Sequence, residues 1–309
     1  MPDEKAMVAK LRKLGARKVL VQIPEGLKMQ ASRISSLLER NGMEALISVE
    51  PCFGACDLLD IEAKQLGCDA LLHIGHSDFG LEAVLPVVYD EFSLYFDPVK
   101  SLEGNMAQLA GFKAIGLVTT AQHIGSLAKA RFFLEKRKKE VLVGRSERLR
   151  PGQILGCDYS AAKSIESAVD CFLFIGSGRF HPLGLVQRTS RPVLFLDAES
   201  GKMSDISGER DKMEVKRRLR IEKARGLSRF GIFVSTKPGQ RNIQRASKLK
   251  KALEKKGKKV VVITASMLTP EKISGMGFEV LVNTACPRIF EDQQLFRLVV
   301  LNPEDAEQI

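Results

Sequence analysis

A pattern of buried strand, short polar loop and amphipathic helix occurs three times along the chain, and it constrains the fold more than any other feature. Each copy begins with a short, continuous run of Val, Ile and other apolar residues, which is typical of a strand buried on both faces. These runs are residues 19–23, 114–118 and 231–234. Each following helix carries apolar side chains at three- and four-residue spacing. These helices are expected near residues 30–40, 126–138 and 243–256.

Three further strands are expected in each of these units. They are residues 45–50, 70–75 and 85–89 in the first, 140–144, 171–176 and 192–197 in the second, and 258–265, 280–283 and 298–301 in the third. Strands that alternate with helices are joined by right-handed crossovers and form a mostly parallel sheet. The sequence therefore predicts an α/β fold of three repeated Rossmann-like units, each a small parallel sheet flanked by helices. The expected boundaries are residues 1–100, 101–212 and 213–309.

Three of the six cysteines fall at matching places in these units. Cys56 follows the second strand of the first unit, Cys157 follows the second strand of the second, and Cys286 ends the third strand of the third. Ligands of open α/β sheets bind beyond the carboxyl ends of the strands. If the units pack around a common centre, three thiolates meet there, and thiolates are the ligands that iron–sulfur clusters select. We therefore predict that these three cysteines hold a cluster with one iron left open for catalysis.

The other three cysteines have different surroundings. Cys68 closes a helix before a strand and Cys171 opens an apolar strand, so both are expected in the core, where unmodified cysteine is common. Cys52 forms a Cys-x3-Cys spacing with Cys56, but no second pair completes a zinc site, and its role stays open.

Three of the four histidines lie within or directly after expected strands of the first two units. His73 lies within an apolar strand and is expected to be a hydrogen-bonded core histidine rather than a ligand. His76 and His123 follow strands, at the edge where ligands bind, and their roles stay open.

Composition narrows the class of protein. The chain carries 48 basic and 37 acidic residues, a net charge of +11, with most of the excess on expected helices. Such a balance steers a protein toward acidic partners or ribonucleoproteins, but no RNA-recognition signature supports direct nucleic-acid binding. No apolar run is long enough to span a membrane. Residues 1–13 form a charged, helix-like segment, which does not match a secretory signal peptide. Six cysteines without an export signal indicate reduced thiols, so a cytoplasmic protein is expected.

Five stretches together resemble the diphthamide-biosynthesis enzymes, over nearly the whole chain. They are Ile23-Pro24-Glu25-Gly26-Leu27, Phe53-Gly54-Ala55-Cys56-Asp57, His73-Ile74-Gly75-His76-Ser77, Gly178-Arg179-Phe180-His181-Pro182 and Thr236-Lys237-Pro238-Gly239-Gln240. The chain most resembles the compact archaeal enzymes that catalyse the first step of diphthamide synthesis, because all three ligand cysteines are present and long insertions are absent. It implies a homodimer of three-domain subunits.

The resemblance also implies a reaction. A 4Fe-4S cluster binds S-adenosylmethionine at its open iron, and one electron from an external donor breaks the bond between sulfur and the methionine γ-carbon. The resulting 3-amino-3-carboxypropyl radical adds to C2 of a histidine on translation elongation factor 2, and methylthioadenosine is released. Ordinary radical S-adenosylmethionine enzymes carry Cys-x3-Cys-x2-Cys. In this chain Cys52 and Cys56 have the spacing of the first two cysteines, but Leu59 occupies the place of the third. The absence of the full motif fits the unusual cleavage.

The residues expected to bind S-adenosylmethionine lie at strand ends and in the family motifs. The predicted set is Glu25, Ser177, Gly178, Arg179, His181, Ser235, Lys237 and Gln240. The carboxylate of the cofactor suits backbone N–H groups at a helix start, which Ser177, Gly178 and Arg179 supply. Its ammonium and sulfonium groups suit a carboxylate, for which Glu25 and Asp57 are the candidates.

Two other functions stay open. Quinolinate synthase is also built from three related α/β units that each give one cysteine to a cluster, and it uses the open iron as a Lewis acid for condensation and dehydration. A non-enzymatic alternative is a basic α/β module that binds ribosomes or RNA and has structural cysteines. The motifs above favour the diphthamide family, whereas the architecture alone does not separate these functions.

Overall fold

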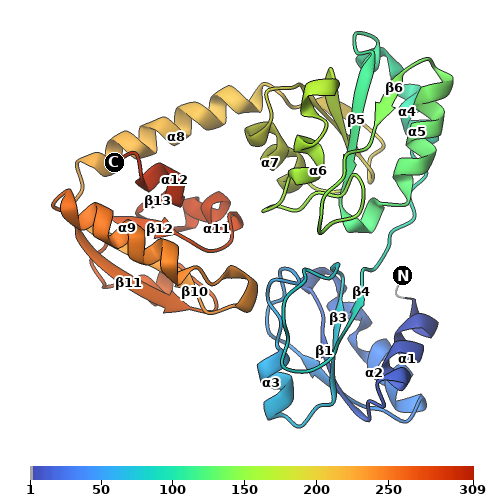
Figure 1. Cartoon of the computed structure of the whole chain (residues 1–309), viewed down its shortest axis with the longest axis horizontal. Helices are drawn as coiled ribbons and strands as arrows, with labels where there is room; N and C mark the ends of the chain where they lie inside the picture. The colour runs from blue at the N-terminus through green and yellow to red at the C-terminus, as the bar shows by residue number, and fades with distance from the viewer. Residues whose placement is uncertain (1–2) are drawn as a thin grey trace. The chain divides into compact units, whose positions relative to one another are not determined.

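The computed structural model describes residues 3–309 as three β-sheets with helices packed against them (Figure 1). Internal contacts divide the chain into two compact units, one that ends at Ser207 and one from Gly208 to Ile309. Two of the sheets belong to the first unit and the third sheet to the second. The predicted α/β class with three small sheets is confirmed. The division at residues 100 and 212, with one domain per sheet, stays a prediction.

The first sheet has the order β2-β1-β3-β4, and all neighbouring strands run parallel. Its strands are β1 (Lys18–Gln22), β2 (Glu44–Ser48), β3 (Ala70–Ile74) and β4 (Val87–Asp90). The accompanying helices are α1 (Glu4–Lys13), the 3-10 helix η1 (Glu25–Gln30), α2 (Ala31–Arg40) and α3 (Asp60–Gln65). One face packs on α1 and α2 through Met7, Leu11 and Leu38, all nearly inaccessible. This face holds the sheet's larger apolar cluster.

The second sheet has the order β6-β5-β7-β8-β9 and is parallel except for β9, which the sequence did not indicate. Its strands are β5 (Ala114–Thr119), β6 (Glu140–Leu142), β7 (Cys171–Gly176), β8 (Val193–Asp197) and β9 (Met203–Asp205). The helices are α4 (Val99–Gly104), η2 (Met106–Leu109), η3 (Ala121–His123), α5 (Ser126–Lys136), α6 (Ser160–Lys163), η4 (Glu166–Ala168) and α7 (Phe180–Arg188). Every residue of β5 and β7 is buried, as their continuous apolar sequences predict.

The third sheet has the order β11-β10-β12-β13 and is parallel throughout. Its strands are β10 (Arg229–Ser235), β11 (Lys259–Ala265), β12 (Val280–Asn283) and β13 (Val299–Leu301). The helices are α8 (Glu209–Arg225), η5 (Pro238–Gln240), α9 (Ile243–Lys255), α10 (Pro270–Ile273), α11 (Arg288–Glu291), η6 (Asp292–Leu295) and α12 (Pro303–Ala306). Apart from β9, the three sheets share one strand order.

This shared order fixes where ligands are expected. In each sheet the chain starts at an inner strand, moves to one edge, and returns to the other side of the first strand. The loops after the first and third strands therefore lead to opposite sides, and the crevice between them is the usual ligand site of such sheets. These pairs are β1 and β3, β5 and β7, and β10 and β12.

A carboxylate at the opposite end of each sheet repeats with the same geometry. Asp69, Asp170 and Glu279 each precede the third strand of their sheet and accept hydrogen bonds from two successive backbone N–H groups at the start of the first strand. The N···O distances lie between 2.7 and 3.1 Å. These backbone hydrogen bonds lower the pKa of all three carboxyl groups. The common feature supports the internal repeat independently of the strand order.

We expect Asp170→Asn to lower the free energy of unfolding at neutral pH and to have little effect in acid. The folded-state pKa of Asp170 lies below its ordinary value of 3.8, so its stabilising contribution is present above that pH and is lost as the pH falls through the folded pKa. Urea unfolding of both proteins at pH 7 and in acid measures the difference. Half-buried Asp158, whose hydrogen bonds are to its own loop, provides the control Asp158→Asn. An equal loss at both pH values would contradict this role.

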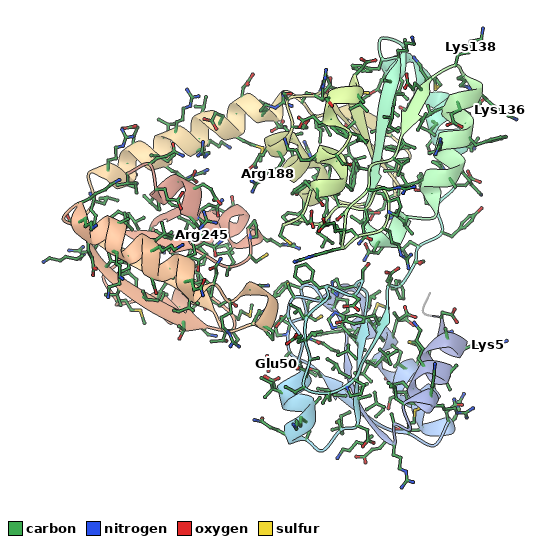
Figure 2. All side chains as sticks on the ribbon, viewed as in Figure 1. Lys5, Glu50, Lys136, Lys138, Arg188 and Arg245 are labelled. Carbon is green, nitrogen blue, oxygen red and sulfur yellow. The ribbon has the colours of Figure 1, made fainter. Side chains whose placement is uncertain are left out.

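The basic residues cover the outer faces of helices. Lys136 and Lys138 at the end of α5 project away from the sheet, and Arg188 at the end of α7 is exposed (Figure 2). A solvated helix face therefore accounts for much of the positive charge. None of the described helices combines the length and the apolar character that crossing a membrane requires.

Candidate metal centre and cofactor site

The six cysteines divide by exposure into two groups of three. Cys52, Cys68 and Cys171 are buried, whereas Cys56 and Cys286 are half-buried and Cys157 is exposed. The more accessible group is the set predicted to bind a cluster. The core positions predicted for Cys68 and Cys171 are confirmed.

Each of the three accessible thiols lies beyond the carboxyl end of its sheet. Cys56 lies in the loop between β2 and α3, and Cys286 lies three residues after β12. Cys157 comes 15 residues after β6, but the chain first returns to the end of β5, where Gln153 pairs in parallel with Thr119. The sheet edge predicted for each cysteine is therefore correct, although the connection to Cys157 is longer than expected.

Tight local geometry holds the loops of Cys56 and Cys286. A Cβ atom at Gly54 would lie 3.3 Å from the Cys56 sulfur, so glycine leaves room for the thiol. In the third sheet, buried Asn283 donates from Nδ2 to the Cys286 carbonyl at 2.8 Å and accepts from the Ala285 N–H at 3.0 Å. Asn283 therefore fixes the turn that presents Cys286.

The turn of Cys157 is closed by reciprocal backbone hydrogen bonds between Leu155 and Asp158, at 2.8 and 3.2 Å. The residue before the cysteine must be small, because a Cβ atom at Gly156 would overlap the ring of Phe180. Phe180 begins α7, next to the predicted cofactor loop. The Cys157 turn and that loop therefore pack against each other.

A second cluster of metal-binding side chains, which the sequence did not predict, lies in the first sheet. The sulfur of Cys52 is 4.0 Å from Nε2 of His73 and 4.0 Å from Nδ1 of His76, and the two ring nitrogens are 3.0 Å apart. Burial, with a smaller contribution from His76, lowers the pKa of His73 to about 3. Burial lowers the pKa of His76 to about 4, so both rings are neutral at neutral pH. The core position predicted for His73 is confirmed.

The predicted cofactor residues of the second sheet occupy the crevice between β5 and β7. Ser177, Gly178 and Arg179 follow β7 directly, and Gly178 has φ +74°, a left-handed conformation that favours glycine. His181, in the first turn of α7, stacks on Phe174 with the ring centroids 6.4 Å apart. The structure thus brings these four residues together at one strand end.

His123, whose role the sequence left open, joins this group. Its Nε2 atom is 3.3 Å from the Ser177 hydroxyl oxygen, while its buried Nδ1 atom has no hydrogen-bond partner in the structure. Burial lowers the pKa of His123. Its position after β5 was the available signal, but sequence alone could not show that the ring turns toward Ser177.

Ser235, Lys237 and Gln240 form a second predicted group, at the end of β10. The hydroxyl of buried Ser235 accepts from the Lys237 N–H at 3.2 Å, and the Gln240 N–H donates to the Lys237 carbonyl at 3.1 Å. Lys237 is only 9% exposed, which is unusual for lysine. Glu25, in contrast, is exposed at the end of β1 and forms an ion pair with Lys28 at 2.6 Å.

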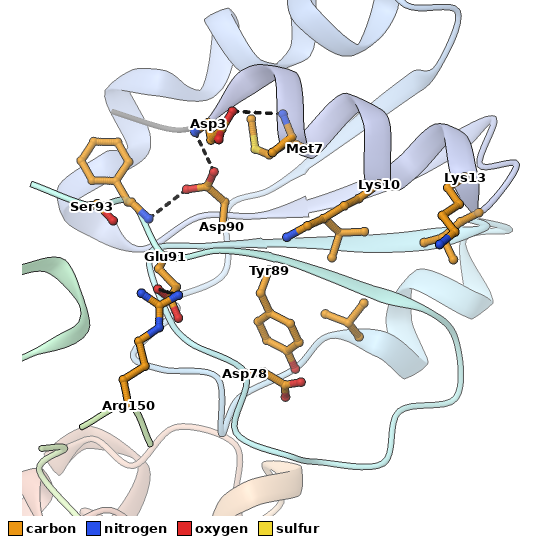
Figure 3. Close-up of a pocket in the computed structure, with 15 residues that line it drawn as sticks. Asp3, Met7, Lys10, Lys13, Asp78, Tyr89, Asp90, Glu91, Ser93 and Arg150 are labelled. Carbon is orange, nitrogen blue, oxygen red and sulfur yellow. Dashed lines mark hydrogen bonds and ion pairs between the residues drawn. The ribbon is translucent and has the colours of Figure 1, made fainter. Parts of the chain in front are cut away.

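A groove of the first unit lies apart from the predicted cofactor residues. It has a volume of about 890 Å³ and lies beside α1 and β4, with Lys10, Tyr89 and Arg150 on its walls (Figure 3). Arg150 reaches Glu91 at 2.7 Å, and burial together with neighbouring Asp78 raises the pKa of Tyr89. None of the described residues that line this groove belongs to the predicted site. The groove is therefore separate from the predicted cofactor residues.

Known proteins resemble this chain along its whole length. Residues 23–309 match the family model described as "Putative diphthamide synthesis protein". A 2-(3-amino-3-carboxypropyl)histidine synthase of Pyrococcus horikoshii is 39% identical, over 97% of this chain and 88% of the relative. Subunit 1 of the corresponding synthase of Caenorhabditis elegans is 30% identical, over 92% of this chain and 73% of that subunit.

Solved structures agree with these sequence matches. The crystal structure of Dph2 from Pyrococcus horikoshii superposes with a TM-score of 0.93 and 37% identity, covering 100% of this chain and 91% of that one. A second crystal structure of that protein, which contains a 4Fe-4S cluster, gives the same TM-score and covers 90% of its chain. Sequence and structure together show that the chain belongs to the diphthamide synthesis protein family.

Proposed function

We propose that the chain catalyses the first step of diphthamide synthesis. It cleaves the bond between sulfur and the γ-carbon of S-adenosylmethionine and transfers the 3-amino-3-carboxypropyl group to C2 of a histidine of translation elongation factor 2, releasing methylthioadenosine. The observation that carries this proposal is the match, over 97% of this chain and at 39% identity, to a 2-(3-amino-3-carboxypropyl)histidine synthase.

The residues present fit a 4Fe-4S cluster. Cys56, Cys157 and Cys286 offer three thiols at the ligand edges of three sheets, and they are the three cysteines that the sheets do not bury. Three thiolates leave one iron of such a cluster without a protein ligand. We propose that the three units place these thiols at a common centre. When bound there, the cluster supplies the low-potential electron that the cleavage requires.

The strand-end residues of the second sheet suit the amino-acid part of S-adenosylmethionine. Gly178 turns the chain before the nine-residue helix α7, and the positive end of a helix dipole attracts a carboxylate. The Ser177 hydroxyl and neutral His123 add polar contacts beside them. Arg179 and His181 complete this group as proposed contacts.

Lys237 is the proposed cofactor contact from the third sheet. Lys237 is held at the end of β10 by Ser235, and Gln240 closes the same loop. A largely desolvated ammonium group attracts a carboxylate more strongly than an exposed one, because water screens it less. Glu25 and Asp57 remain the candidates for the positive sulfonium and ammonium groups.

The proposal extends to partners. Translation elongation factor 2 is the protein substrate, an external donor supplies the electron, and the working form is a homodimer in the cytoplasm, without a membrane or direct nucleic-acid contact. The 29–30% identity to subunit 1 of eukaryotic synthases over most of this chain agrees with a shared substrate.

A product assay under strict anaerobiosis tests the proposed function. The chain is reconstituted with iron and sulfide, supplied with S-adenosylmethionine and dithionite, and its nucleoside products are separated. We expect methylthioadenosine that depends on both iron and reductant. Deoxyadenosine instead would show cleavage on the other side of sulfur and contradict the proposed geometry.

The same assay separates the two alternative functions. If the protein carries a full cluster but forms neither methylthioadenosine nor deoxyadenosine, the result favours the Lewis-acid chemistry of quinolinate synthase. A chain that binds no iron and keeps its binding partners after Cys286→Ala favours a ribosome- or RNA-binding module.

A further inference from the structure

Three metal-binding side chains converge at the carboxyl edge of the first sheet, one of them from the loop that also carries Cys56. Cys52 lies in the loop after β2, and His76 lies in the loop after β3. His73 is the penultimate residue of β3. Their ligand atoms all lie within 4.8 Å of one another. Cys52 and His73 are buried and His76 is half-buried, so the group has one side open toward solvent.

We propose that Cys52, His73 and His76 bind a divalent metal ion of the zinc class, at a site separate from the three cluster cysteines. One thiolate and two imidazoles are common zinc ligands, and three protein ligands leave a fourth tetrahedral position for water. The proposal does not depend on the proposed reaction, because none of these residues is among the predicted cluster ligands.

The distances agree with this ion after small movements. Two imidazoles on one tetrahedral zinc ion have ring centroids about 5.3 Å apart, given Zn–N distances of about 2.05 Å. The centroids of His73 and His76 are 5.2 Å apart. The rings therefore need to pivot but not to separate. The sulfur must approach each nitrogen from 4.0 Å to about 3.6 Å, a change within the reach of a side-chain rotation.

Hydrogen bonds around His73 orient it as a ligand. The amide nitrogen of Gln22 donates to the Asp57 carbonyl at 2.6 Å, which fixes its oxygen toward His73. That oxygen accepts from Nδ1 of His73 at 2.9 Å. The lone pair of the neutral ring then lies on Nε2, the atom that faces Cys52 and His76. Histidine ligands of metals are commonly held in this way by a second hydrogen-bonding residue.

The sheet register explains why this arrangement is stable in the core. Gln22, His73 and Tyr89 are successive partners across β1, β3 and β4, so their side chains share one face at the ligand edge. One pleat repeat earlier, Leu20, Leu71 and Val87 occupy the same face and belong to an apolar cluster. The polar row therefore lies directly above a packed core, and the metal would join it to the loop that carries Cys56.

Proton balance is simple for this binding. Without metal, Nε2 of His73 accepts a hydrogen bond from Nδ1 of His76, at 3.0 Å. On binding, the thiol of Cys52 releases one proton to solvent, and the proton of His76 moves from Nδ1 to Nε2. No oxidant or reductant is required, and both rings remain neutral.

Metal analysis of the reconstituted protein tests the proposal. After incubation with Zn²⁺ and removal of the excess, we expect about one zinc per chain in addition to iron. Cys52→Ser should lose the zinc and keep the iron, whereas Cys56→Ser should lose iron and keep the zinc. Zinc that disappears with iron in Cys56→Ser, or that persists in Cys52→Ser, would overturn the separate site.

Cobalt gives a spectroscopic test that is independent of the cluster. The full chain with Cys56, Cys157 and Cys286 replaced by serine is titrated with Co²⁺ under a phosphine reductant. We expect a thiolate-to-cobalt charge-transfer band that saturates at one equivalent and is removed by Zn²⁺. Adding Cys52→Ser should abolish the band and weaken binding at least about 100-fold, since changes around a ligand already cost 10–100-fold.

Two further variants keep the result interpretable. Cys68→Ser, another buried thiol of the same sheet, should leave the band unchanged. His76→Gln alters the half-buried ligand and should weaken Co²⁺ binding without unfolding the chain, even if His73→Gln fails to fold. Absence of a saturating band in the folded serine variant would refute the proposal.

Discussion

Cys56→Ala, Cys157→Ala and Cys286→Ala are each expected to abolish cluster binding and the formation of methylthioadenosine. Each thiol is one of three at the ligand edges, and a cluster held by only two thiolates has lost one of its three protein ligands. Changes to residues that merely support a ligand cost 10–100-fold, so loss of a ligand should reduce turnover at least about 100-fold. Iron content, the visible absorbance of the cluster and product formation measure the effect.

Cys171→Ala is the matched control, because it removes a buried thiol from the same chain. It should cost at most about 1–2 kcal/mol of unfolding free energy, the usual range for a small core change, and leave iron content unchanged. A loss of iron in Cys171→Ala, or an intact cluster in any one of the three ligand variants, would disprove the ligand assignment.

The strands could be predicted because they carry unambiguous patterns. Residues 114–118 and 171–176 were expected as buried strands, and β5 and β7 occupy Ala114–Thr119 and Cys171–Gly176. Continuous apolar runs leave no polar face, so they suit strands in the interior of a parallel sheet. Strand β9 was missed because Met203–Asp205 is short and polar and pairs only at an edge.

The site was less accessible to sequence reasoning. Matching positions identified Cys56, Cys157 and Cys286, since strand ends are fixed by the same patterns as the strands. The group of Cys52, His73 and His76 was missed because it depends on side-chain direction and on register between strands that are far apart in sequence. The pairing of Gln22 with His73 across β1 and β3 places these side chains together, and no local motif records it.

The strand register also shows that residues at equivalent positions of two sheets have different roles. His73 and Asn283 occupy the same place in their sheets, four residues into pairing with the first strand, and both are buried and hydrogen bonded. His73 supports a candidate metal ligand set, whereas Asn283 shapes the turn of Cys286. The first and third sheets therefore share one buried polar position and use it for different purposes, whereas Phe174 occupies the equivalent position in the second sheet.

Gly75→Ala is expected to be the most damaging single-methyl change at the strand ends of the first sheet. Gly75 has φ +89°, and a Cβ atom there would lie 2.8 Å from Cγ of Pro24 in the neighbouring loop. Left-handed backbone costs a non-glycine residue about 1–2 kcal/mol, and overpacking adds about 1–3 kcal/mol. We expect a loss of about 2–4 kcal/mol in unfolding free energy, measured by urea denaturation.

Gly80→Ala separates the two contributions to this loss. Gly80 has a similar φ of +71°, but a Cβ atom there would meet nothing within 4 Å, so only the backbone cost of about 1 kcal/mol applies. The difference between the variants measures the contact between Gly75 and Pro24. Because Gly75 lies between His73 and His76, Gly75→Ala should also weaken Co²⁺ binding in the cobalt titration. Equal stability losses for both variants would show that the loops after β1 and β3 are not tightly packed, and that the candidate metal ligands are held by hydrogen bonds alone.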